Sequence, residues 1–280
     1  ITTSGNVIKQ GGEFGTDKLK LQSISGIGVD QTLGFIWVCD QKGNKLVRFD
    51  SDGRPDIKVT KNMKFPMDVT VDNDSNLYVI MTRNPDIYKY DSEGNFIDKI
   101  GGKGKGALVF PTSITIHKDV LYVTDFGGKR IAKFDLEGNY IEEIKNKGEY
   151  EEMQGPSGLT LDEDGNLYVL DLGEVPVVVL TPDGKLISQI GSFGNQEGSF
   201  LYPTGVIANS KDDVFVLDKN TRREKVSSLA KHIGFLFQNP DRQICCENVR
   251  DELMFSFKAQ GAAGPEAEER VDQIIKSFGF

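Results

Sequence analysis

Four aspartates recur at one position of a repeated pattern, and their residue type allows two kinds of chemistry. Each follows a short apolar run, and the four are Asp40, Asp125, Asp171 and Asp218. A ring of carboxylates at one edge of a fold can supply the oxygen ligands that a cation prefers. Alternatively, each aspartate caps its own turn by accepting hydrogen bonds from backbone N–H groups. We favour the capping interpretation.

Basic residues stand directly after the same apolar runs. They are Arg83, Lys129, Arg130, Arg222 and Arg223. Since they share an edge with the aspartates, they are candidates to contact an acidic ligand or partner at that rim. The alternative is that they are solvated surface charges without a ligand.

Metal and thiol chemistry have little support in this sequence. His117 and His232 are the two histidines, too few for the usual zinc sites, and His117 stands where other copies of the pattern have Asp or Asn. We therefore predict that His117 is a turn residue. Cys39 is isolated, and the adjacent Cys245 and Cys246 form neither a Cys-x-x-Cys motif nor a disulfide framework.

The charge balance and the apolar runs exclude further classes of partner. A net charge of -9 and a pI near 4.9 oppose binding to phosphate backbones, so we expect no nucleic acid partner. No run of 18 or more apolar residues occurs, and we expect no membrane span. The sequence opens at Ile1 without a Met or an apolar leader, which suggests that a signal was removed or that this is an excised piece.

The elements that must position these residues come from an internal repeat. Pro66, Pro111, Pro156 and Pro203 follow one another at intervals of 45, 45 and 47 residues, and each opens a short run of apolar and small residues. A further copy over 24–30 lacks the proline. Such a period is typical of propellers built from one sheet per repeat.

Each copy predicts four short antiparallel strands. A second apolar run follows each opening phrase, at 36–40, 77–81, 121–125, 167–171 and 214–218. A further hairpin then follows, for example 131–135 and 140–144, with Asp-Gly or Glu-Gly at its turn. Tyr78, Tyr122, Tyr168 and Phe215 are equivalent positions and are expected in the core. We predict an all-β propeller in which small sheets bury their faces against one another.

The repeated phrase closely resembles the NHL repeat family over residues 1–223. The resemblance consists of the opening Pro, the Asn-Leu-Tyr-Val run ending in Asp, and Phe-Asp before the Gly turn. Met81 replaces that Asp in one copy. The resemblance implies about five to six blades, with segment 3–12 as the outer strand of a blade completed by the far end of the chain. Because the fifth copy does not continue, we expect an unclosed ring with exposed strand edges.

The pattern changes near residue 223. Beyond it, Val271, Ile274, Ile275 and Phe278 repeat at helical spacing, which predicts a small α/β fragment over 224–280. Segment 233–240, Ile-Gly-Phe-Leu-Phe-Gln-Asn-Pro, resembles the Q-loop of ATP-binding subunits of ABC transporters of the energy-coupling-factor and cobalt importer type. The resemblance gives Gln238 a role in contacting Mg²⁺ and the attacking water.

This second segment lacks the parts that phosphoryl transfer requires. No GxxxxGK[ST] loop is present, and the signature motif and Walker B carboxylate would lie beyond Phe280. ATP and Mg²⁺ would be cofactors only if those parts were supplied, and we expect no other cofactor. The segment alone is not expected to hydrolyse ATP. We interpret the chain as a partial propeller joined to a partial ATP-binding domain, a chimera that is a natural gene, an engineered fusion or an artefact of sequence assembly.

The predicted function is therefore binding rather than catalysis. A rim of the propeller would contact a protein, a glycan or a small ligand, and open strand edges would favour self-association. The alternative is a fragment of the ATP-binding subunit of a metal or vitamin importer. The two resemblances imply different compartments, extracytoplasmic for the propeller and cytoplasmic for the ATP-binding segment.

Overall fold

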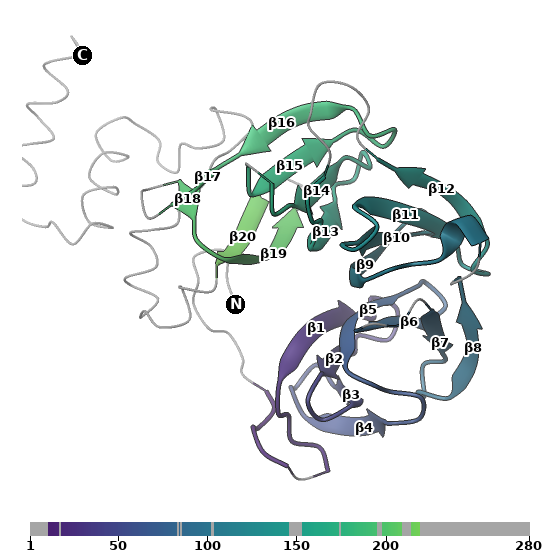
Figure 1. The fold of residues 1–280 in the computed structure, drawn as a ribbon. Helices are drawn as coiled ribbons and strands as arrows, with labels where there is room; N and C mark the ends of the chain where they lie inside the picture. The colour runs from purple at the N-terminus through teal and green to yellow at the C-terminus, as the bar shows by residue number, and fades with distance from the viewer. Residues whose placement is uncertain are drawn as a thin grey trace, which may run out of the picture.

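The structure is a computed structural model that describes residues 11–218, with gaps at 17, 83, 85, 102–103, 146–152, 174, 195–197 and 209–213. The regular secondary structure of its described part is almost entirely β-strand (Figure 1). The predictions for segment 1–10 and for 219–280, including the helices and the Q-loop, lie outside the described residues.

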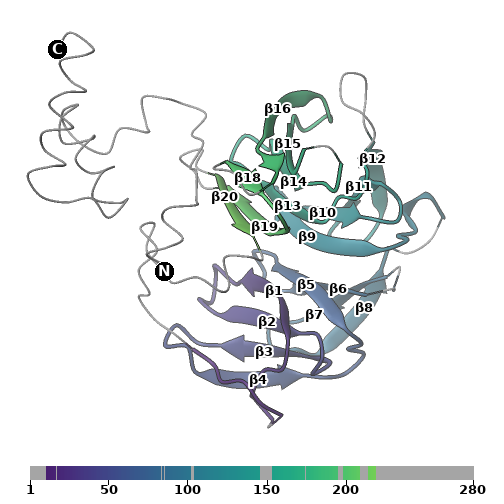
Figure 2. The same cartoon turned by 60° about the vertical axis from the view of Figure 1, so that its left-hand side comes forward.

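Four complete four-stranded sheets and one hairpin follow one another along the chain. Blade 1 comprises β1 (Ile24–Val29), β2 (Ile36–Asp40), β3 (Lys45–Phe49) and β4 (Pro55–Val59). Blade 2 comprises β5 (Pro66–Val71), β6 (Leu77–Met81), β7 (Ile87–Tyr90) and β8 (Phe96–Ile100). Blade 3 comprises β9 (Pro111–His117), β10 (Val120–Asp125), β11 (Arg130–Asp135) and β12 (Tyr140–Ile144). Figure 2 shows the strands of blade 1 side by side in chain order.

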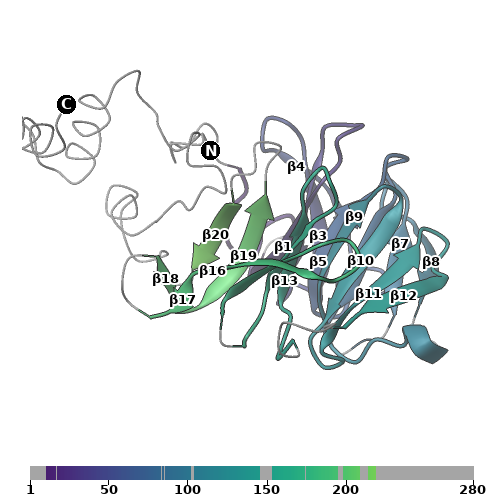
Figure 3. The same cartoon turned by 90° about the horizontal axis from the view of Figure 1, so that it is seen from above.

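The fourth and fifth repeats are shorter. Blade 4 comprises β13 (Gly158–Leu161), β14 (Leu167–Leu170), β15 (Val177–Leu180) and β16 (Leu186–Ile190). A short parallel pair, β17 (Ser192–Phe193) and β18 (Ser199–Phe200), links it to the hairpin of β19 (Pro203–Ala208) and β20 (Val214–Asp218), seen from above in Figure 3. A 3-10 turn, η1 (Gly104–Gly106), connects blades 2 and 3. The sheets do not close into a ring within the described residues.

The predicted strands agree closely with the observed ones. The second strands β2, β6 and β20 have the predicted bounds, and β14 ends one residue early, at Leu170. Leu170 pairs with Val177, and the residue before Val177 is Pro176, whose carbonyl accepts the N–H of Asp171 at 3.2 Å but which has no N–H to donate in return. The Gly residues of the Asp-Gly and Glu-Gly turns, for example Gly53 and Gly94, have positive φ as those turns require.

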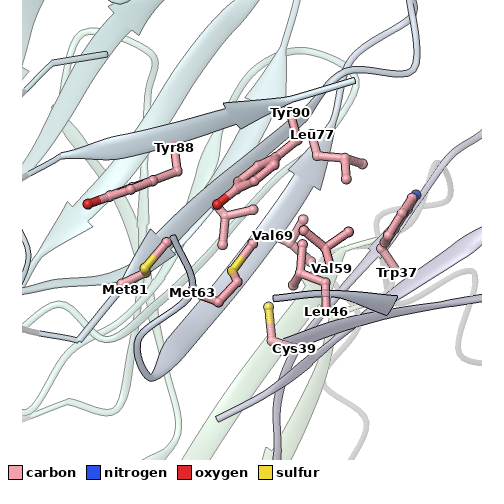
Figure 4. Close-up of a cluster of buried hydrophobic side chains, with 11 residues drawn as sticks. Trp37, Cys39, Leu46, Val59, Met63, Val69, Leu77, Met81, Tyr88 and Tyr90 are labelled. Carbon is pink, nitrogen blue, oxygen red and sulfur yellow. The ribbon is translucent and has the colours of Figure 1, made fainter. Parts of the chain in front are cut away.

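Blades 2, 3 and 4 bury both of their faces against neighbouring blades, so the core is a series of layers between blades. Leu77 and Met81 belong to one buried cluster with Trp37 and Leu46 of blade 1 (Figure 4), and Val79 belongs to the same cluster. The alternate side chains of the same strand, Tyr78 and Ile80, pack toward blade 3. This alternation follows from the period of two along a strand. The expected core positions of Tyr78, Tyr122 and Tyr168 are confirmed, while Phe215 is half-buried.

The antiparallel registers give the array two distinct faces. The strand-two ends pair with the strand-one starts, as Asp125 does with Pro111, so the loops after strand two and the links between blades share one face, here called the Asp face. The turns between strands one and two and between strands three and four share the other, the hairpin face. Contacts between equivalent turns of neighbouring blades, such as Thr32 Oγ1 to Asn73 O at 2.9 Å, show that the blades have the same orientation.

Candidate functional site

The recurrent aspartates fasten the start of each blade to the end of its second strand. Asp125 Oδ1 accepts the N–H groups of Val109 at 3.0 Å and Phe110 at 2.8 Å, just before the blade-opening Pro111. The same positions donate in the other copies: Gln22 and Ser23 to Asp40, Gln154 and Gly155 to Asp171, and Leu201 and Tyr202 to Asp218. The turn-capping bonds are also present, from Gly43 to Asp40 and from Gly128 to Asp125.

These carboxylates are buried rather than presented to solvent. Asp40 and Asp125 have no exposed surface and Asp171 has 1%. Their oxygens accept backbone hydrogen bonds in the described structure, so their shared effect is to fix the loops of the Asp face. Asp218, on the last strand, is half-buried.

Buried cations reinforce two of these aspartates. Arg130 Nε lies 3.1 Å from Asp125 Oδ2, and the same guanidinium donates to Glu143 and to the carbonyls of Lys105 and Ala107. Burial alone would lower the pKa of Arg130, but the hydrogen bonds to Glu143 and Asp125 outweigh it and raise the pKa. Lys45 lies 3.5 Å from Asp40 in blade 1. Arg130 thus holds the link between blades 2 and 3 and is not free to contact a ligand.

Blade 2 replaces this arrangement because Met81 stands where the other copies have Asp. The Met81 sulfur accepts the N–H of Lys64 at 3.3 Å, and the N–H of Phe65 is accepted by Asn44 Oδ1 of blade 1 at 2.8 Å. Thr82 N donates to the Phe65 carbonyl at 3.0 Å. Phe65 has φ of 50°, an uncommon conformation for an aromatic residue, and these partners on both sides hold it there.

Five consecutive connections on the Asp face of blades 1 to 3 are strongly basic. We call them the basic rim, and they are segments 41–44, 60–65, 82–86, 101–110 and 126–129. Their basic residues are Lys42, Lys61, Lys64, Arg83, Lys103, Lys105 and Lys129, and their one carboxylate is Asp86. Asp86 is itself paired with Lys99 at 3.6 Å. Arg83 and Lys103 lie outside the described residues; the other five lysines are exposed.

Apolar side chains are exposed among these lysines. Phe65 is 54% exposed and Val109 62% exposed. Phe110 of segment 101–110 and Phe126 of segment 126–129 pack edge to face, with their ring centroids 5.8 Å apart. Exposed apolar side chains surrounded by polar residues are a feature of interaction sites. We take the basic rim as the candidate functional site.

The remaining predicted residues lie elsewhere. His117 ends β9 on the hairpin face, where its Nε2 is buried without a hydrogen-bond partner among the described atoms, and burial lowers its pKa. Cys39 is buried and its thiol pKa is raised, first by burial and then by the charge of Asp68. Arg222, Arg223 and Gln238 lie outside the described residues, as does Arg83. Sequence reasoning missed Lys42, Lys61, Lys64 and Lys105. The segments that contain them have almost no carboxylates, and this signal could have identified them.

The described residues contain no group of His, Cys, Asp and Glu arranged to hold a metal ion. Within that same part of the chain, no helix has both the length and the apolar character needed to cross a membrane.

Comparisons with known proteins support the propeller. Residues 63–156 match a family described as a 6-bladed beta-propeller. The streptogramin B lyase structure superposes with a TM-score of 0.55 at 19% identity, covering 70% of this chain and 62% of the lyase. The nidogen/laminin complex gives 0.56 at 18% identity, covering 71% of this chain and 73% of the matched one. These likenesses show the fold alone.

Part of the chain is also related to ABC transporter ATP-binding proteins. The energy-coupling factor transporter ATP-binding protein EcfA of Methanocaldococcus jannaschii is 30% identical over 100 residues, covering 35% of this chain and 36% of EcfA. The biotin transport ATP-binding protein BioM of Rhizobium etli is 31% identical over 103 residues, covering 36% and 45%. The chain spans less than half the length of these curated relatives. The matched share is larger than segment 224–280, so the alignments include residues before 224.

Proposed function

We propose that the propeller part of this chain is a non-enzymatic binding module and that its basic rim contacts an anionic ligand. Lys129 and Arg83 belong to the contacting set, together with Lys42, Lys64 and Lys105. Asp40, Asp125, Asp171, Asp218 and Arg130 have a positioning role, because they fix the loops that carry the contacting residues.

The observation that carries this proposal is the difference in charge between the basic rim and the hairpin face. The basic rim has one carboxylate, in a chain whose net charge is -9. On the hairpin face the exposed carboxylates are Asp52, Asp74, Glu93, Asp119, Glu137, Glu163, Asp164 and Asp183. An anionic ligand would therefore be steered toward the basic rim and repelled by the hairpin face.

Charge reversal on the rim tests this function. The native chain and the variant Lys42→Glu/Lys64→Glu/Lys129→Glu are compared for binding to immobilised heparin, poly-L-glutamate and anionic phospholipid vesicles. The matched control is Arg54→Glu/Lys118→Glu/Lys185→Glu, which makes the same change in net charge on the hairpin face; Lys118 also shares the positive φ of Lys129. We expect at least one probe to bind the native chain and the control but not the rim variant. If no probe shows this dependence, the proposal is wrong.

We also propose that the ATP-binding relationship reflects an incomplete segment over 224–280 that does not hydrolyse ATP alone. The matches to EcfA and BioM support a second candidate function, a fragment of the ATP-binding subunit of an importer. Calorimetric titration of the full chain with Mg-ATP separates the two. Saturable binding would favour the second candidate, and its absence would favour a binding module whose ATP-binding segment is inactive.

A further inference from the structure

Three lysines of the basic rim lack the ion pair with a described carboxylate that several other surface lysines have. Outside the rim, Lys99, Lys133, Lys145 and Lys185 each lie within 3.6 Å of a carboxylate. No described carboxylate lies within ion-pair distance of Lys42, Lys64 or Lys105. Uncompensated cations in an acidic protein raise the local potential, and an arriving anionic group would find them without an ion pair to break.

Their spacing along the rim is set by contacts between neighbouring connections. The side chain of Asn44, in segment 41–44, accepts the N–H of Phe65, and the N–H of Thr82, in segment 82–86, donates to the Phe65 carbonyl. Gln41 Nε2 contacts Met67 Sδ at 3.0 Å and Thr82 Oγ1 at 3.4 Å. Three connections from two blades are thus joined around one exposed aromatic ring.

The second half of the rim is fixed in a similar way. Phe126 N donates to the Phe110 carbonyl at 2.9 Å, and Arg130 holds the carbonyls of Lys105 and Ala107. Val109 is exposed on this frame beside Gly127, where an added Cβ would lie 2.7 Å from Val109 Cγ1. Lys105, Val109 and Lys129 are therefore presented from segments with fixed backbones.

The mixture of groups decides the chemistry of the partner. A phosphate or sulfate polymer is held mainly by dense cations and gains little from exposed aliphatic carbons. A polypeptide bearing carboxylates among apolar side chains would pair its charges with the lysines and bury Phe65 and Val109. The apolar positions also continue along the Asp face into blades 4 and 5, with Leu172 at 54% and Tyr202 at 62% exposure.

We propose that the basic rim is a docking surface for an acidic polypeptide segment that also carries apolar side chains. This inference rests on the proposed function and narrows it to one class of partner.

Fluorescence anisotropy with designed peptides tests it on the full chain. One labelled peptide repeats Glu with Leu and Phe, a second repeats Glu with Ser at equal charge and length, and a labelled heparin oligosaccharide is the third probe. We expect the Glu/Leu/Phe peptide to bind about tenfold or more tightly than the Glu/Ser peptide. Its affinity should fall with salt and fall about tenfold in Lys42→Glu/Lys64→Glu/Lys129→Glu, but not in the hairpin-face control.

A second variant isolates the aromatic contribution. Phe65→Asn removes the aromatic ring and introduces a residue type that adopts positive φ more readily than phenylalanine. Leu33→Asn is its control, because Leu33 is 49% exposed on the hairpin face. Phe65→Asn should weaken binding of the Glu/Leu/Phe peptide and leave the affinity for heparin unchanged. Circular dichroism confirms that each variant is folded.

Each other outcome overturns the inference in a distinguishable way. Equal or tighter rim-dependent binding of heparin or of the Glu/Ser peptide would leave the proposed function standing and refute the polypeptide class. Concentration-dependent self-association that the rim variant abolishes would make the acidic hairpin face of a second copy the occupant instead. If no probe binds through the rim, both proposals fail together.

Discussion

Asp68 Oδ2 on β5 accepts the hydroxyl of Ser113 on β9 at 2.8 Å, so a carboxylate joins the innermost strands of neighbouring blades. The same oxygen accepts the N–H of Ile114 at 3.1 Å, and Oδ1 accepts that of Val69 at 3.0 Å. Burial raises the pKa of Asp68 from 3.8 to about 6, and these three hydrogen bonds only partly oppose the shift. Protonation of this carboxyl is therefore coupled to folding.

Asp68 should make the protein more stable as the pH falls from about 6 to about 4. Its folded pKa is above the unfolded value of 3.8, so its favourable contribution is complete below 3.8 and is lost as the pH rises through 6. Relative to Asp68→Asn, the native chain should gain about 2 kcal/mol in unfolding free energy across this range. Urea denaturation of both proteins at several pH values measures the difference. A difference that does not change with pH would show that Asp68 titrates normally.

The close approach of β1 and β5 is a second feature of the inner strands. A Cβ on Gly26 would lie 2.5 Å from Asp68 Oδ1 and 2.6 Å from the Asp68 Cα, so the two strands would have to separate. Gly26→Ala should cost about 2 kcal/mol of stability. Gly205, the equivalent residue in the last hairpin, would meet only the Leu217 Cβ at 3.7 Å, so Gly205→Ala is the matched control and should cost little. Similar losses in both variants would contradict this packing.

The strands could be predicted from the sequence because their signals are local. The run Leu77–Met81 is apolar, has β-branched and aromatic residues at its centre and is bounded by turn residues, so the observed β6 matches it. The contacts made at strand ends are not local. Asp125, at the end of β10, accepts the N–H groups of residues 15 and 16 positions earlier, and no periodicity in the sequence reveals which N–H groups it will bond. The parallel pair β17–β18 has two residues per strand, too few for a pattern.

The candidate site was predicted in part for the same reason. Lys129 and Arg130 are adjacent in sequence and look alike, yet Lys129 is exposed while Arg130 is buried against Asp125. Alternation along a strand separates them only once the start of β11 at Arg130 is known. The role of Asn44 in blade 2 depends on Met81 standing in place of an aspartate, which becomes visible only when both blades are placed together.

Asn44 should control the presentation of Phe65. Asn44→Gly keeps the positive φ of 50° accessible but removes the amide that accepts the Phe65 N–H, at a cost of about 1 kcal/mol. Asn44→Ala should cost about 1 kcal/mol more, because alanine is strained in that conformation. Denaturant unfolding gives both values, and anisotropy with the Glu/Leu/Phe peptide should show weaker binding by Asn44→Gly. Unchanged stability in Asn44→Gly would mean that the Phe65 N–H finds another acceptor.

Asp125→Ala should be among the most damaging substitutions in the propeller. It removes the acceptor of three N–H groups and leaves the buried guanidinium of Arg130 without its fully buried carboxylate partner, with only Glu143 still paired to it, at a cost of about 3–5 kcal/mol. Asp125→Asn keeps one acceptor oxygen and should cost less. Asp183→Asn, at an exposed turn, is the control and should change stability by no more than about 0.5 kcal/mol.

The double variant Asp125→Ala/Arg130→Met separates the two parts of that cost. If the loss of the Asp125 charge beside the buried guanidinium dominates, replacing Arg130 with an apolar side chain should restore part of the stability that Asp125→Ala removes, so the two changes will not be additive. Thermal and denaturant unfolding of the four members of this cycle give the coupling energy. A double variant that loses the full sum of the single losses would show that the backbone N–H groups of Val109 and Phe110, rather than Arg130, depend most on Asp125.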